Sequence, residues 1–137
     1  MSLDPQLITE TKEWLTKAAE DLRAAKHAFG AEPPLFGDIV FHCQQATEKA
    51  LKGFLTWHSH PFRKTHSIES VGEQCLLVDS TLKAIIDRAV PLTEYAWKYR
   101  YPGESADPDE AEAQGAIGIA RDVFATVLER LPGEVRP

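Results

Sequence analysis

Residues 41–55 read FHCQQATEKALKGFL, and this stretch decides the fold class. Apolar residues recur in it at three- and four-residue steps, the spacing of a helix face that packs on a core. We expect this helix to run from about Phe36 to Trp57. Its buried stripe comprises Val40, Cys43, Thr47, Ala50, Leu51, Phe54 and Leu55. Its other side is polar, which raises the question of whether that side is solvated surface or faces something specific.

The same helical spacing continues on the N-terminal side of this stretch. Asp4-Pro5 combines a helix-capping side chain with a proline at the first helical position, which is a helix-start signal. From there apolar residues recur at three- and four-residue steps as far as Phe29, and Gly30 with the pair Pro33-Pro34 ends the pattern. The sequence therefore predicts a long first helix.

Two further helices are expected after the loop over residues 58–67. A short helix should run from Ser67 to about Leu77. Asp79 or Ser80 then caps a longer helix that contains Pro91, where a missing backbone donor predicts a kink or a break.

The final helix has the clearest start signal, Asp107-Pro108-Asp109-Glu110, which predicts Asp107 as the cap and Pro108 at the first helical position. The helix should continue to Pro132. Gly115 and Gly118 lie early in it, where small residues would let a neighbouring backbone approach closely.

No strand pattern and no internal repeat accompany these helices. Short links force neighbouring helices to run in opposite directions. The sequence therefore predicts an all-α fold, an antiparallel up-and-down bundle of four long helices plus one short helix, in a single domain over residues 1–137.

The composition is that of an ordinary folded domain, with 43% hydrophobic and 26% charged residues among 137. A net charge of −6 disfavours sequence-blind nucleic-acid binding, which requires a broad basic surface. No apolar run approaches the roughly 20 residues that cross a bilayer, and no export signal opens the chain. We therefore expect a cytoplasmic protein that does not contact membranes, with Cys43 and Cys75 as buried thiols.

The polar side of residues 41–55 supports two interpretations. His42, Gln45, Lys49 and Lys52 form one stripe at steps of three, four and three, and their many donors suit a phosphate or a nucleobase edge. Alternatively, Glu48 and the lysines form surface ion pairs worth less than about 1 kcal/mol each. On this stretch alone, the second interpretation is preferred.

Other candidate sites are weaker, with Arg100 as the exception. His58, His60 and His66 lack a nearby carboxylate or cysteine to complete a tetrahedral set, so we expect no metal and no cofactor. Nucleophile-elbow and phosphate-loop motifs are absent from the sequence. Arg100 lies between Tyr99 and Tyr101. It is either half of a buried ion pair, with Asp21 or Glu48, or a bidentate phosphate clamp beside stacking rings.

Four segments, in order, resemble HEPN domains, the higher eukaryotes and prokaryotes nucleotide-binding helical bundles. AAEDLRAAKHAF (18–29) resembles their first helix and FHCQQATEKALKGFL (41–55) their second-helix signature. KTHSIESV (64–71) is similar to the start of their short third helix, and YRYPG (99–103) to the junction before their last helix. The resemblance covers about residues 10–131.

The resemblance implies a helical domain that usually forms a homodimer and works beside a small nucleotidyltransferase partner, as in a toxin–antitoxin pair. It also implies that eight polar positions line one cleft. These are Asp21, His42, Gln45, Glu48, Lys49, His66, Arg100 and Tyr101.

Many family members are metal-independent ribonucleases marked by an arginine and, after four to six intervening residues, a histidine. Here Arg63 precedes His66 by only two intervening residues, and no histidine follows Arg100. We therefore expect a non-catalytic module that binds a nucleotide or phosphate ligand and acts with the nucleotidyltransferase. The alternatives are a ribonuclease that uses His42, His66 and Arg100 on RNA, and a purely structural dimerising subunit.

Overall fold

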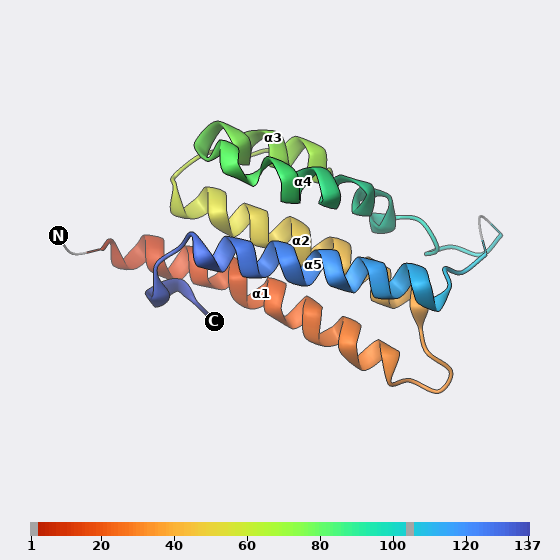
Figure 1. The fold of residues 1–137 in the computed structure, drawn as a ribbon. Helices are drawn as coiled ribbons and strands as arrows, with labels where there is room; N and C mark the ends of the chain where they lie inside the picture. Colours follow the sequence, from red (N-terminus) through yellow and green to blue (C-terminus); the bar gives the residue numbers. More distant parts are fainter. Residues whose placement is uncertain (1–2, 104–105) are drawn as a thin grey trace.

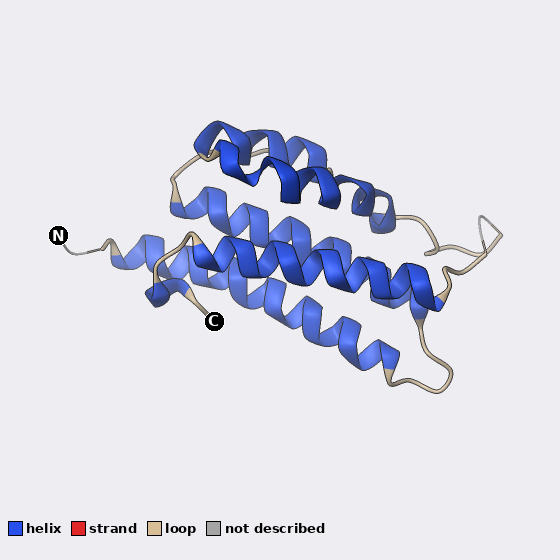
Figure 2. Ribbon diagram, in the orientation of Figure 1, coloured by secondary structure: helices blue, strands red, loops and turns tan. Residues whose placement is uncertain are grey.

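The computed structural model describes residues 3–103 and 106–137, and within these ranges it contains helices and no strand (Figures 1 and 2). The predicted all-α bundle is confirmed. Its α-helices are α1 (Pro5–Phe29), α2 (Phe36–Trp57), α3 (Ile68–Val78), α4 (Lys83–Ala89) and α5 (Glu110–Glu129). Three 3₁₀ helices accompany them, η1 (Ser80–Leu82), η2 (Val90–Ala96) and η3 (Gly133–Val135).

Helix α2 is the centre of the bundle. It packs against α1 and α5, and α3 and η2 form a second layer against it (Figure 1). Gly53 allows the close approach of α1, because a Cβ atom at this position would lie 3.0 Å from Leu15 Cδ2 and 3.2 Å from Trp14 Cβ. This glycine therefore has a packing role that the helical spacing alone did not indicate.

The caps predicted for α1 and α5 can be compared with the structure, and one of them is wrong. Asp4 caps α1 by accepting a hydrogen bond from the Gln6 amide at 2.9 Å, as predicted. The predicted cap of α5 is wrong: the Asp109 carboxylate, not that of Asp107, accepts from the Glu112 amide at 2.8 Å. Both aspartates are suitable caps, but the Asp109 backbone is extended, with φ −89° and ψ 177°, so the first turn starts after Asp109.

The predicted break at Pro91 is confirmed. The α-helical segment ends at Ala89, and the chain continues as the 3₁₀ helix η2. The fourth element is therefore a composite of η1, α4 and η2 rather than one continuous α-helix. Its last part carries Tyr95 toward α5 and leads into the junction that contains Arg100.

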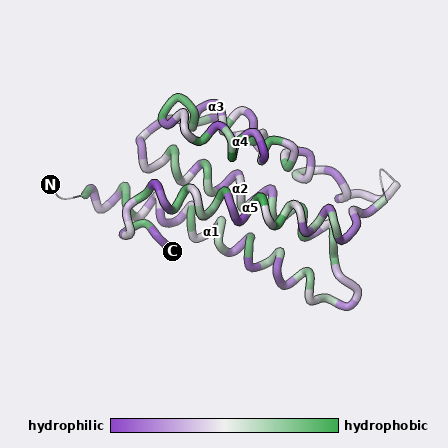
Figure 3. Tube along the Cα trace, in the orientation of Figure 1, coloured by the Kyte–Doolittle hydropathy of each residue, from purple (hydrophilic) through white to green (hydrophobic). Residues whose placement is uncertain are grey.

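The core is built from the apolar faces of all five α-helices. Hydrophobic and hydrophilic residues alternate along the helices (Figure 3), as expected where one face is buried. Cys43 and Cys75 are fully buried, and burial raises the pKa of each thiol to about 12, so both are packing residues, as expected. Within the described part of the chain, no helix combines the length and apolarity needed to cross a bilayer.

Candidate functional site

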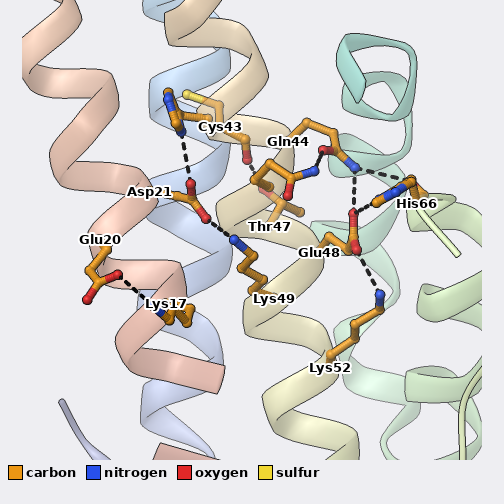
Figure 4. Close-up of polar contacts among 12 residues, drawn as sticks. Lys17, Glu20, Asp21, Cys43, Gln44, Thr47, Glu48, Lys49, Lys52 and His66 are labelled. Carbon is orange, nitrogen blue, oxygen red and sulfur yellow. Dashed lines mark hydrogen bonds and ion pairs between the residues drawn. The ribbon is translucent and has the colours of Figure 1, made fainter. Parts of the chain in front are cut away.

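Asp21 is the centre of a first polar cluster between α1 and α2. Its Oδ1 lies 2.9 Å from His42 Nδ1, and its Oδ2 accepts a hydrogen bond from Lys49 Nζ at 2.7 Å. The carboxylate is mostly buried and comes from the helix that packs most closely on α2 (Figure 4). A single side chain of α1 thus holds two residues of α2 that are two turns apart.

Glu48 is the centre of a second cluster and is only 3% exposed. Its Oε1 accepts from Lys52 Nζ at 2.7 Å, and its Oε2 accepts from Gln44 Nε2 at 2.9 Å and lies 3.0 Å from His66 Nδ1 (Figure 4). Burial alone would raise the pKa of Glu48, but these hydrogen bonds hold it below its usual value. The preferred interpretation of a surface ion pair is therefore wrong, because the pair with Lys52 is buried.

The second cluster also anchors the loop between α2 and α3. Gln44 Nε2 donates to the His66 carbonyl at 3.1 Å, and Lys52 Nζ donates to the Thr65 carbonyl at 2.9 Å. Gln45 Nε2 donates to Gln44 Oε1 at 2.6 Å, which brings the exposed side of α2 into the cluster. We refer to the two clusters together as the α2 polar network. Its members are Asp21, His42, Gln44, Gln45, Glu48, Lys49, Lys52 and His66.

Both histidines of the network are oriented by a carboxylate. With the proton on Nδ1, His42 donates to Asp21 and His66 donates to Glu48, and each imidazole keeps its Nε2 lone pair for another partner. The side chain of His66 is 69% exposed and that of His42 is 31% exposed. Both rings are therefore held from the inside and can still meet a ligand from outside.

The Phe41 ring connects Arg100 to this network. Its guanidinium carbon is 3.7 Å from the centroid of the Phe41 ring, and the same ring packs edge-on against His42 at 5.3 Å. Arg100 is exposed and has no hydrogen bond or ion pair with any described residue. The alternative of a buried ion pair with Asp21 or Glu48 is wrong, because lysines and histidines already occupy both carboxylates.

Phe41 is the ring that meets Arg100, and the sequence pattern had not singled it out. The signal was present, because this aromatic residue precedes His42 and stands four positions before Gln45, outside the buried stripe. The stacking rings expected beside Arg100 were instead those of the neighbouring tyrosines, Tyr99 and Tyr101. Only the packing of the junction against α2 shows which ring the guanidinium meets.

The tyrosines near Arg100 in the chain do not stack on its guanidinium, and two of them make other contacts. Tyr95 and Tyr99 both donate to Glu112 Oε2, at 2.9 and 3.1 Å, and so fasten the junction to α5. Burial and the Glu112 carboxylate raise the pKa of Tyr95, which therefore keeps its proton as a donor. Tyr101 is 65% exposed, and none of the hydrogen bonds or ring contacts among described residues involves it.

The three histidines weighed as metal ligands have separate partners. The His58 ring packs on Phe54, His60 is hydrogen-bonded to Gln74 at 2.8 Å, and His66 faces Glu48. Among the described residues, no group of three or more histidine, cysteine, aspartate or glutamate side chains is arranged to hold a metal ion.

The chain was also compared with known proteins. A family model described as HEPN domain matches residues 11–131, which is most of the chain. No curated protein and no solved structure matches it.

Proposed function

The chain belongs to the HEPN domain family, and from this premise we propose that it is a non-catalytic module that binds a nucleotide or another phosphate ligand. In this proposal it acts with a small nucleotidyltransferase partner, as one half of a toxin–antitoxin-like pair. The ligand occupies the face of α2 that carries His42 and Gln45, beside Arg100.

The observation that carries this proposal is the position of the Arg100 guanidinium. The lysines of the α2 polar network are neutralised within the chain, Lys49 by Asp21 and Lys52 by Glu48. Arg100 has no such carboxylate among the described residues, yet the Phe41 ring holds it in place. A planar, fixed guanidinium suits bidentate recognition of a phosphate.

We assign the predicted site residues to two groups. In this proposal Arg100 supplies charge for the phosphate. The His42 ring, which contacts the same Phe41 ring, and the Gln45 amide one helical turn further along α2 offer hydrogen-bonding atoms for the rest of the ligand. Asp21, Glu48 and Lys49 act indirectly, because their charged atoms already have partners inside the fold. His66 lies on the other side of the glutamine pair and suits a second phosphate or a ribose.

Calorimetry with the full chain tests this proposal, with AMP, ATP and inorganic phosphate as probes. We expect Arg100→Ala to weaken nucleotide binding about tenfold or more, and Phe41→Ala to weaken it less. Arg88→Ala is the matched control, since Arg88 is an exposed arginine on α4. No nucleotide or phosphate binding by the wild type, or equal losses in the Arg100 and Arg88 variants, would refute the proposal.

The partner is tested separately by purifying the chain from its native host. We expect a nucleotidyltransferase to be recovered with it, identified by mass spectrometry. We expect light scattering of the chain alone to give twice its mass of 15.3 kDa, as for the homodimer that the family resemblance implies. A monomer that recovers no nucleotidyltransferase would contradict this part of the proposal.

A ribonuclease is the second candidate, favoured by the two carboxylate-bound histidines. One neutral imidazole can take the proton of a ribose hydroxyl, and a second in its protonated form can donate to the leaving oxygen, each contributing about 10²–10⁴-fold in rate. His42→Ala and His66→Ala should then each lower RNA cleavage about 100-fold, while the exposed His27→Ala should not. RNA left intact by the wild type excludes this candidate.

A further inference from the structure

A groove between α1 and α5 lies outside the α2 polar network. Its volume is about 440 Å³, and an adjoining hollow of about 520 Å³ extends it toward the C-terminal end of α1. Arg23 and Lys26 line both hollows, so the two form one continuous surface. The other residues of the groove are Leu22, Phe29, Gln114, Ile117 and Arg121.

The groove is positively charged without compensation. Arg23, Lys26 and Arg121 have no ion pair or hydrogen bond through their side chains with any described residue. Some exposed cations elsewhere pair with carboxylates of the chain, as Arg88 does with Asp122 and Lys83 with Asp87, whereas this groove gathers three that do not. On a protein with a net charge of −6, three uncompensated cations in one groove mark a place for an external negative charge.

The floor of the groove is apolar, and the groove is about as long as two turns of an α-helix. Leu22, Phe29 and Ile117 are packed against the core and remain partly exposed. The lining residues span about two turns of each helix, or about 10 Å. Beside the groove, a Cβ atom at Gly118 would have no neighbour within 4 Å, so no backbone of the described residues makes the close approach expected there.

We propose that this groove binds an acidic amphipathic helix of a partner protein. The apolar face of such a helix lies on Leu22, Phe29 and Ile117, and its carboxylates pair with the three cations along the rim. Recognition of this kind, in which a helix docks in a groove through anchors at helical spacing, uses one apolar stripe and complementary flanking charges. The open α5 backbone at Gly118 allows the partner helix to lie close.

Two other occupants fit the groove less well. Single-stranded nucleic acid stacks on several free rings along a basic track. Among the described residues, the rings that line these hollows are His27 and Phe29, and Phe29 already packs edge-on against Phe36 at 6.1 Å. A second copy of this chain, placed symmetrically on the groove, would bring the same three cations against each other. Charge complementarity therefore selects an acidic protein segment.

Fluorescence anisotropy with the full chain tests this inference. The probes are two labelled peptides of about 18 residues, long enough to form a helix, with leucine at helical spacing and either glutamate or lysine at the remaining positions. We expect saturable binding of the acidic peptide only. Arg121→Glu and Ile117→Ser should each weaken it about tenfold, while Arg88→Glu, outside the groove, should not.

Other results would overturn the proposal. Absence of binding, or binding that Arg121→Glu leaves unchanged in a variant that melts like the wild type, overturns the proposal. Loss of a homodimer by light scattering in Arg121→Glu would assign the groove to a second copy. If the wild type binds a labelled RNA oligonucleotide and Arg121→Glu does not, the groove would be assigned to RNA. Arg100→Ala should keep peptide binding, so this result is independent of the nucleotide site.

Discussion

The α2 polar network and the α1–α5 groove differ in whether their charged side chains are paired within the chain. In the network, Asp21 and Glu48 are buried and each lysine has its carboxylate within the chain. In the groove, the cations have no partner among the described residues. Charges of the first kind are paired within the chain and stabilise the fold. Charges of the second kind are unpaired among the described residues and are available to an external ligand. Arg100 lies next to the network but belongs, by this criterion, with the second kind.

The largest effect in this comparison is expected at Glu48. Glu48→Gln leaves the Lys52 ammonium buried without its counter-charge, which typically costs about 3–5 kcal/mol in the free energy of unfolding. Urea unfolding followed by circular dichroism measures it. Arg88→Ala, which breaks an exposed pair with Asp122, is the control and should cost less than about 1 kcal/mol. A similar small loss in both variants would mean that the network is not structural.

The pH dependence of stability should follow from the same carboxylate. The pKa of Glu48 is held below its usual value of 4.5 in the folded chain, so its contribution is complete above that pH and is lost as pH falls through the lowered folded value. We expect the unfolding free energy to fall below about pH 4.5, and to fall less steeply in Glu48→Gln. Equal acid slopes in the two proteins would contradict the assignment.

Substitution of two helical glycines should give changes in stability of intermediate size and opposite sign. Gly53→Ala puts a methyl group 3.0 Å from Leu15 where α1 and α2 meet, and overpacking of this kind costs about 1–3 kcal/mol. Gly118→Ala meets no atom beside the groove and should raise stability by about 0.5–1 kcal/mol. Melting temperatures that move in the same direction would show that the two faces are packed alike.

The smallest effect is expected in the groove itself. Because Arg121 has no carboxylate partner within the described chain, Arg121→Ala should change the unfolding free energy by no more than about 0.5 kcal/mol. Chemical denaturation beside the wild type measures this difference. A loss above about 1 kcal/mol would reveal an internal partner and remove the reason to expect an external one.

Much of the fold follows from local rules. The cap at Asp4 and the break at Pro91 follow from the chemistry of single residues, and the helix over residues 36–57 follows from the spacing of its apolar side chains. The start of α5 does not, because Asp107 and Asp109 are equally good caps by residue type, and their local sequence does not distinguish them.

The site was harder to predict, because it depends on how separate elements meet. Spacing along α2 placed His42, Gln45 and Lys49 on one stripe, but it contained no information on the burial of Glu48 against the loop at His66. The contact of Arg100 with Phe41 joins residues far apart in the chain. Such contacts are set by tertiary packing, which periodicity within one helix does not determine.

The most direct test of the central claim is an NMR titration of the full chain with AMP, following backbone amide and arginine side-chain signals. We expect the largest shift changes to fall on Phe41, His42, Gln45 and Arg100, and Arg100→Ala to abolish them. Changes that fall instead on Leu22, Arg23 and Ile117 of the groove, or that persist in Arg100→Ala, would contradict it.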